Sequence, residues 1–382
     1  MSSFIKAISI VSIFFISTYF SSAQKMNVEF RQVILEEGFN YPFSSIDLLP
    51  DNKTAVIGSQ TGKIYLWDIT TEKVVKKLEV SGYSYGPRIK VSEDGKYLLL
   101  QKQFLQDFNY NKDRKTKVEI LDIESGKIVF TTADVNDAVL TSDNKYVVTI
   151  NGENTDVFEL TSGNKVRSIY IEGATNAIAV NKECTQIAVS HLLRKEDIAD
   201  IPYIRDDKKT QKTVLKFRQG VSFYDFERGT KIKTASDIFD VVYALKFTKD
   251  GKKLLVYNVA NTKLQGQVRG GMGLRQGYIN QINTATCEVL RPIVSSLTPE
   301  PDFKESPDNK FLGVSSSEIQ GKMVQTLLLY DFNSGALVHR FEVNTRLLSE
   351  KGSTLPVYFI FYPADNKILL TYAAGTVAVW DY

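Results

Sequence analysis

A unit of about 40 residues recurs seven times along this 382-residue chain, and a repeat of this length constrains the fold more than composition does. The clearest copy spans Ser44 to Val80 and reads SSIDLLPDNKTAVIGSQTGKIYLWDITTEKVVKKLEV. It divides into four short, largely apolar segments separated by turns rich in Asp, Asn, Gly and Lys. This pattern is typical of a four-stranded antiparallel β-meander.

Two short signatures mark every copy. The turn after the first strand recurs as PDNK at 50–53, SEDGK at 92–96, SDNK at 142–145, NKECT at 181–185, TKDGK at 248–252, SPDNK at 306–310 and PADNK at 363–367. The third strand ends in an apolar residue followed by an acid or amide, as LWD at 66–68, ILD at 120–122, VFE at 157–159, FYD at 223–225, QIN at 281–283, LYD at 329–331 and VWD at 379–381. Both signatures keep the same order throughout and predict seven equivalent sheets.

The irregular ends of the repeat complement each other. The seventh copy stops at Tyr382, directly after its third strand, so its fourth strand is missing. Residues 27–36, NVEFRQVILE, precede the first copy and are similar to the fourth-strand segment KVVKKLEV. We therefore expect residues 27–36 to complete the seventh sheet and close a ring, which removes an open β-edge.

These features resemble seven-bladed β-propellers of the WD40/YVTN type, over a single domain at 24–382. Trp67-Asp68 and Trp380-Asp381 match the WD dipeptide, and Tyr146 to Gly152, YVVTING, is similar to the YVTN repeat of bacterial and archaeal surface propellers. The resemblance implies an all-β fold of four-stranded antiparallel blades. No blade carries the Gly-His pair of regular WD40 repeats, so their Asp-His-Ser/Thr-Trp hydrogen-bond network is not expected and the propeller is divergent.

The first 23 residues have the pattern of a cleavable signal peptide. Lys6 precedes an apolar run from Ala7 to Phe20, and Ser21-Ser22-Ala23 supply the small residues that signal peptidase accepts. The apolar run is short for a span of about 30 Å of hydrocarbon. We expect cleavage near Ala23 and a bacterial protein exported to the periplasm or secreted, with no membrane span in the mature chain. A retained membrane anchor is the alternative.

Composition limits the classes of function that the chain can have. Apolar residues make up 43% of the chain and charged residues 24%, which are globular values. The net charge of +3 falls to +2 without Lys6, too little to indicate a nucleic-acid partner. Two Cys and two His give no support to a disulfide scaffold or a His-rich metal site. No catalytic motif is present, and we expect no cofactor, no metal and no catalytic residue.

Surplus residues fall between the second and third strands of four blades. They occupy 101–117 in blade two, 191–218 in blade four, 258–277 in blade five and 315–325 in blade six. These loops emerge on one face of a propeller, so we expect raised hairpins around one mouth of the channel. They carry 17 Lys and Arg against 8 Asp and Glu, a surplus of nine positive charges in a mature chain of only +2.

This surplus predicts a basic rim that binds a partner. The expected binding residues are Arg205, Lys208, Lys209, Arg269 and Arg275, in the two most elaborated adjacent blades. The expected function is that of a non-enzymatic scaffold for another protein or an acidic glycan of the cell envelope. Under the alternative interpretation, lysines on long hairpins only serve solubility and edge protection.

Other functions remain open at this stage. The shorter connections between blades carry Asp134, Asp137, Glu172, Asp237, Asp240, Glu300 and Asp302, which predict an acidic channel mouth. Such a mouth would suit a propeller enzyme, by analogy with lactonases, lyases and quinoproteins, with Asp134, Asp137, Asp237 and Asp240 holding Ca²⁺. A glycan-binding module with a site at the mouth is another alternative. A disulfide between Cys184 and Cys287 cannot be judged from spacing.

Overall fold

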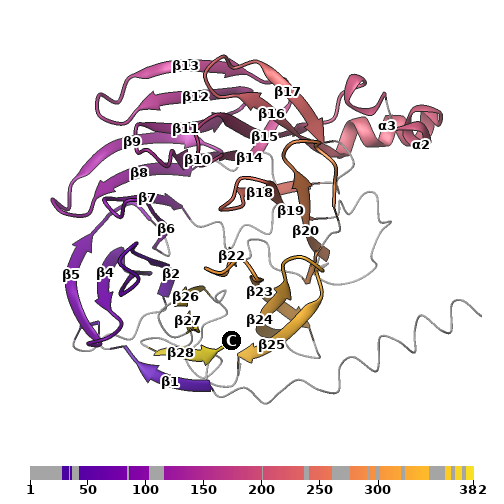
Figure 1. Cartoon of the computed structure of the whole chain (residues 1–382). Coiled ribbons are helices and arrows are strands. Elements are labelled where there is room, and N and C mark those ends of the chain that lie inside the picture. The colour runs from indigo at the N-terminus through magenta and orange to yellow at the C-terminus, as the bar shows by residue number, and fades with distance from the viewer. Residues whose placement is uncertain are drawn as a thin grey trace, which may run out of the picture.

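The structure, a computed structural model, describes residues 28–33, 35–36, 43–83, 86–102, 116–199, 201–235, 241–259, 276–290, 293–296, 302–319, 323–343, 358–362, 366–371 and 376–382. The expected signal peptide at 1–23 lies outside these residues. Seven four-stranded antiparallel sheets stand as blades around a central channel, in chain order around the ring (Figure 1). The predicted seven-bladed β-propeller is confirmed.

Every blade places one strand at each of four positions, numbered outward from the channel. The first strands are β2 (Phe43–Leu48), β6 (Pro87–Val91), β10 (Asp137–Leu140), β14 (Ala174–Val180), β18 (Val241–Phe247), β22 (Phe303–Glu305) and β26 (Phe359–Tyr362). The second strands are β3 (Thr54–Ser59), β7 (Tyr97–Lys102), β11 (Tyr146–Asn151), β15 (Gln186–Leu192), β19 (Lys253–Val259), β23 (Phe311–Ile319) and β27 (Lys367–Thr371). The third strands are β4 (Lys63–Asp68), β8 (Thr116–Asp122), β12 (Asn154–Glu159), β16 (Gln219–Asp225), β20 (Gln276–Asn283), β24 (Met323–Asp331) and β28 (Thr376–Asp381). The fourth strands are β5 (Lys73–Glu79), β9 (Ile128–Val135), β13 (Lys165–Tyr170), β17 (Lys231–Ala235), β21 (Ile293–Ser296), β25 (Leu337–Val343) and β1 (Val28–Gln32).

The N-terminal strand closes the ring. β1 pairs antiparallel with β28 in a register that runs from Val28 opposite Trp380 to Gln32 opposite Thr376. The expected closing strand at 27–36 is confirmed, in the shorter form Val28–Gln32. This pairing gives β28 a hydrogen-bonding neighbour on both sides, so the third strand of blade seven is not left as an edge.

The core is divided among the contacts between blades. Seven apolar clusters each join the facing surfaces of two neighbouring blades. Trp67 lies in the cluster between blades seven and one, and Trp380 lies in the cluster between blades six and seven. Because every blade is buried on both faces, its inner strands carry apolar residues on both sides of the pleat.

The first recurrent signature is a turn capped by its own side chains. In blade two, Ser92 Oγ donates to Asp94 Oδ1 at 2.8 Å, and the same oxygen accepts the N–H of Lys96 at 3.0 Å. Blades three, five and six repeat this arrangement. The next residue has a positive φ, 74° at Gly95 and 56° at Asn144, which explains why Gly or Asn follows the Asp.

The acid of the second signature caps the next turn. Asp68 Oδ1 accepts the N–H groups of Thr70 and Thr71 at 2.8 and 2.7 Å, and these bonds, that from Thr71 most, hold the pKa of Asp68 below its ordinary value. Asp122 and Asp331 do the same for their own turns. Asp68, the acid of the first WD dipeptide, therefore stabilises a turn.

The tryptophans of the two WD dipeptides are held by packing. Trp67 and Trp380 are buried, and neither indole Nε1 has a hydrogen-bond partner among the described residues. The Trp380 ring packs against Phe341 with centroids 4.9 Å apart. In regular WD40 blades this indole belongs to a polar network that includes the His of the Gly-His pair. No blade carries that pair here.

Substitution of Trp380 separates packing from hydrogen bonding. Trp380→Phe should lower the free energy of unfolding by less than about 1.5 kcal/mol, because most of the apolar contact is retained. Trp380→Ala should lower it by roughly 3–5 kcal/mol through the cavity it leaves. Urea denaturation followed by circular dichroism measures both. Equal losses in the two variants would contradict the expectation that a phenyl ring retains most of the packing.

Candidate functional site

The four insertions occupy the predicted place in their blades, between the second and third strands. In blade six, β23 and β24 continue as a long hairpin whose pairing reaches Ile319 opposite Met323, as predicted. Most of the insertions of blades two and five, at 103–115 and 260–275, lies outside the described residues, and so do Arg269 and Arg275. Blade four therefore provides the fullest view of an insertion.

The blade-four insertion is helical, so the prediction of a hairpin there is wrong. It forms η1 (Glu196–Ile198), α2 (Pro202–Arg205) and α3 (Lys208–Phe217). Asp207 begins α3 as its N-cap, since its side chain accepts the N–H of Lys209 at 3.0 Å. We call residues 193–218 the helical arm.

The helical arm has a small apolar core of its own. Leu193, Ile198, Ile204 and Val214 are buried together, with Leu215 packed against them. The spacing of Val214 and Leu215 leaves the opposite face of α3 to polar residues, which is the pattern of an amphipathic helix. None of these residues belongs to the seven clusters between blades. The arm is thus a separate packing unit.

The arm projects to the outside of the ring. Figure 1 shows α2 and α3 beyond blade four, away from the channel. An ion pair between Asp197 and Lys231 on β17, the outermost strand of the blade, agrees with this position. The expectation that this insertion rises around the channel mouth is therefore wrong.

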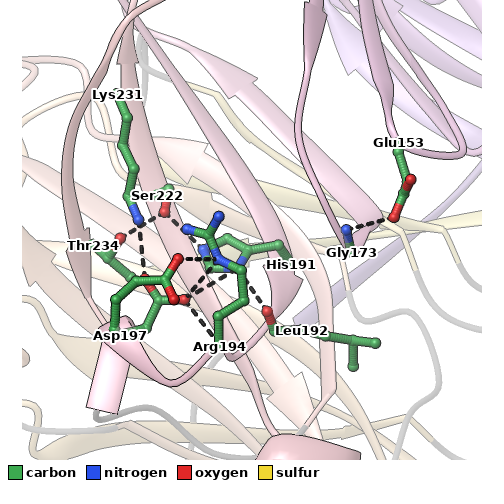
Figure 2. Close-up of polar contacts among 10 residues, drawn as sticks. Glu153, Gly173, His191, Leu192, Arg194, Asp197, Ser222, Lys231 and Thr234 are labelled. Atoms are coloured by element: carbon green, nitrogen blue, oxygen red, sulfur yellow. Dashed lines mark hydrogen bonds and ion pairs between the residues drawn. The ribbon is translucent and has the colours of Figure 1, made fainter. Parts of the chain in front are cut away.

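A buried carboxylate ties the arm to blade four (Figure 2). Asp197 is 1% exposed, and its Oδ1 accepts from Lys231 Nζ at 2.9 Å. Its Oδ2 accepts from the backbone N–H and the Nε of Arg194, at 3.0 and 3.2 Å. Burial alone would raise the pKa of Asp197, but the bonds from Lys231 and Arg194 outweigh it and hold the pKa at about 2.

Beside this carboxylate a polar chain crosses blade four from β15 to β17. His191 Nδ1 lies 2.8 Å from the Leu192 carbonyl oxygen and must be the protonated nitrogen. Nε2 therefore accepts from Ser222 Oγ at 2.7 Å, and Ser222 in turn accepts from Thr234 Oγ1 at 2.7 Å. Burial favours this neutral form by lowering the pKa of His191.

This chain resembles a Ser-His-Asp triad in composition only. His191 Nδ1 lies 3.9 Å from Asp197 Oδ2, beyond hydrogen-bond range. Ser222 and His191 are 0% and 1% exposed, so no substrate can reach the hydroxyl in this arrangement. The His191–Ser222–Thr234 chain joins the second, third and fourth strands of blade four beneath the Asp197 cluster.

The structure gathers three of the five predicted binding residues on the arm. Arg205 ends α2, and Lys208 and Lys209 form the first turn of α3; all three are exposed. Arg205 is engaged by the neighbouring Asp206, with Nε and Nη2 at 2.8 and 3.1 Å from its two carboxylate oxygens. The lysines are therefore the more accessible cations.

Two further basic residues were not among the predicted binding residues. Lys212 and Lys216 are exposed and follow Lys208 at successive intervals of four, which places the three lysines along one face of α3. The spacing itself was the available signal. A spacing of four residues places side chains on one face only in a helix, whereas the repeat predicted a hairpin at 191–218.

The acids predicted at the channel mouth are partly structural. Asp137 Oδ2 accepts the N–H of Ile178 in the next blade at 3.1 Å, and its Oδ1 accepts from Ala138 and Gln101. Asp302 Oδ2 accepts the N–H of Phe359 at 3.3 Å in the same way. These carboxylates join adjacent first strands.

The remaining acids of that set do not form a described site. Asp134 and Glu172 are exposed, while Asp237, Asp240 and Glu300 lie outside the described residues. Across the described ranges, no group of three or more His, Cys, Asp or Glu side chains is arranged to hold a metal ion.

Cys184 and Cys287 are free thiols. Both have positive φ, 53° and 59°, and occupy the turn positions that Gly or Asn fills in other blades. No helix within the described part of the chain has the length and apolar character needed to cross a bilayer.

Comparison of the sequence with known protein families and curated proteins finds no match. Among solved structures, the chain is similar to the β-propeller domain of Cps50 (Swd1) from Myceliophteria thermophila, with a TM-score of 0.59 and 13% identity. The similarity covers 93% of this chain and 100% of that one. At this identity it shows the propeller fold alone.

Removing the buried carboxylate should release the helical arm. Asp197→Ala is expected to favour arm opening by about 2 kcal/mol, roughly 30-fold, because Lys231 and Arg194 lose their charged partner. Limited proteolysis within 194–218 measures the opening. Asp206→Ala, which breaks only an exposed pair, is the control and should change cleavage little. Unchanged cleavage in Asp197→Ala would show that the apolar core alone holds the arm.

The arm should also loosen in mild acid. The lowered pKa of His191 means that an opened arm takes up a proton more readily than a closed one, so this stabilisation is complete above about pH 6.5 and declines below it. Asp197 does not contribute in this range, since its pKa is about 2. Amide exchange in 194–218, corrected for intrinsic rates, should rise between pH 7 and pH 5. His191→Asn should remove that pH dependence, and a persistent rise would assign it to another group.

Proposed function

We propose that this protein is a non-enzymatic propeller scaffold that binds another protein or an acidic glycan of the cell envelope through the insertions of blades two, four, five and six. It acts after export and cleavage near Ala23, in the periplasm or outside the cell. The propeller fold supports a scaffold role, because a ring of seven blades provides a rigid base for binding loops.

The observation that carries this proposal is the basic face of α3. Lys208, Lys212 and Lys216 lie along one side of a helix that contains no acidic residue. Like charges four residues apart destabilise a helix by about 0.2–0.5 kcal/mol per pair. Lys208 and Lys209 also stand at the helix N-terminus, where the helix dipole favours negative charge.

This arrangement favours a binding role over a purely structural one. Protection of a β-edge does not apply to a helix, and solubility does not require cations at the least favourable end of α3. An anionic partner would reduce both the repulsion between the lysines and the unfavourable interaction of Lys208 and Lys209 with the helix dipole. Several cations on a broad face would also speed its association, an effect that added salt screens.

The test compares two variants with the same charge change. Lys208, Lys209 and Lys212 are changed to Glu in one, and the exposed Lys73, Lys127 and Arg228 in the other. Each protein, as residues 24–382, is immobilised and exposed to native cell-envelope extract and, separately, to a soluble polyuronate. The wild type and the control should retain a partner that the arm variant loses at least tenfold, and retention should weaken with added salt.

A protein recovered from the extract identifies a protein partner, and binding of the polyuronate identifies an acidic glycan. Circular dichroism and thermal unfolding establish that all three proteins are equally folded. Equal binding by the arm variant and the control would refute the arm as the docking surface. A second pair of substitutions, Arg269→Ala and Arg275→Ala, tests the contribution of blade five.

A further inference from the structure

A second candidate surface lies along the central channel of the propeller. A cavity of about 660 Å³ is lined by the first strands and by the turns that follow them, including Pro50, Glu93, Ser142, Lys182, Lys249 and Pro307. In an antiparallel blade these turns lie at the end opposite the connection between the second and third strands. The cavity therefore runs along the channel, from these turns to Gln101 and Thr116 beside the blade-two insertion.

Cations from three blades line this cavity. Lys90 on β6, Lys246 on β18 and Lys304 on β22 are all lining residues. On β6, exposed Lys90 alternates with buried Ile89, so its side chain lies on the other face of the blade from Ile89. Lys304 Nζ donates to the Ile46 carbonyl oxygen at 2.9 Å. Among the described residues, the ammonium groups of Lys90 and Lys246 form no hydrogen bond or ion pair.

The nearby acids already have partners, and Asp47 and Asp302 also pair with Lys304, the former at 3.7 Å. Asp137 and Asp302 join adjacent first strands, and Asp47 likewise accepts the N–H of Val91 at 2.9 Å. Lys304 lies 3.4 Å from Asp302 Oδ2. Glu305 Oε2 accepts the N–H of Lys249 at 3.2 Å, and burial raises the pKa of Glu305, which weakens it as a counter-charge.

Lys246 is the least favourably placed of these cations. Desolvation lowers its pKa to about 8, and the ammonium groups of Lys90 and Lys304 act in the same direction. Glu305 and Asp302 oppose the change without overcoming it. A half-buried positive charge without a paired counter-ion is unfavourable unless a ligand supplies the missing charge.

We propose that this cavity binds a small anion with at least two negative charges, carried by phosphate or carboxylate groups, and that Lys90, Lys246 and Lys304 hold it. The volume is in the range of small-molecule sites. Ammonium groups from three blades converge on it, and lysine binds phosphate or carboxylate as a flexible point charge. This site is formed by the first strands and contains no residue of the helical arm.

Calorimetric titration of residues 24–382 with pyrophosphate and with citrate, at pH 7 and low ionic strength, tests the proposal. The wild type should bind at least one of them, and Lys246→Met should weaken that binding tenfold or more. Binding of pyrophosphate alone would identify a phosphate ligand, and binding of citrate alone a carboxylate. Lys73→Met, on the outer strand of blade one, is the control and should bind as the wild type does.

Two readouts distinguish a binding role from a structural one. The ligand-free Lys246→Met protein should melt at a higher temperature than the wild type, because an uncompensated cation has been removed. For whichever anion binds, raising the pH from 7 through 8 and above should weaken binding by the wild type, beyond any change in Lys246→Met, because Lys246 then loses its proton. Failure of both anions to bind, or equal affinity in Lys246→Met and wild type, would overturn the proposal.

Discussion

The antiparallel pairing of β1 with β28 is the contact on which the rest of the ring depends. Each blade buries both faces against its neighbours, so the seven apolar clusters form a closed circle without an end. Val33 and Leu35, which follow β1, already belong to the cluster between blades seven and one. The pairing thus joins the two ends of the chain and also positions apolar residues at the junction.

Repeated local chemistry explains why the fold could be read from the sequence. Asp94 and Asp68 each cap a turn that recurs around the ring, and Gly95 supplies the positive φ that such a turn requires. These interactions involve residues close in the chain, so their pattern is visible without a structure. The same reasoning correctly predicted where the insertions begin and end.

The structure of the insertions and the set of residues that line the channel could not be predicted from the repeat. The repeat carries no information about 193–218, and only helical geometry shows that Lys212 continues the face of Lys208. Lys90 and Lys246 are separated by 156 residues and line the same cavity only because their strands share one channel. Asp137, expected at an acidic channel mouth, lines the cavity, and its carboxylate also accepts a backbone N–H of the next blade. Spacing in the sequence does not reveal that backbone contact.

The propeller therefore presents two faces of different character. On one, the insertions vary in form, with a hairpin in blade six and helices in blade four. On the other, capped turns of similar form line one end of the channel cavity, near Lys90, Lys246 and Lys304. Uniform turns suit a ligand enclosed by many blades, whereas varied insertions suit a large partner approached from one side.

The separate core of the helical arm has a consequence for affinity. Its four buried apolar residues and the Asp197 cluster form a unit that can open while the ring stays intact. A partner that recognises the folded arm would meet only the closed fraction of molecules, and its apparent dissociation constant would rise in inverse proportion to that fraction. The ion pairs of the buried Asp197 would then set the affinity for the partner without contacting it.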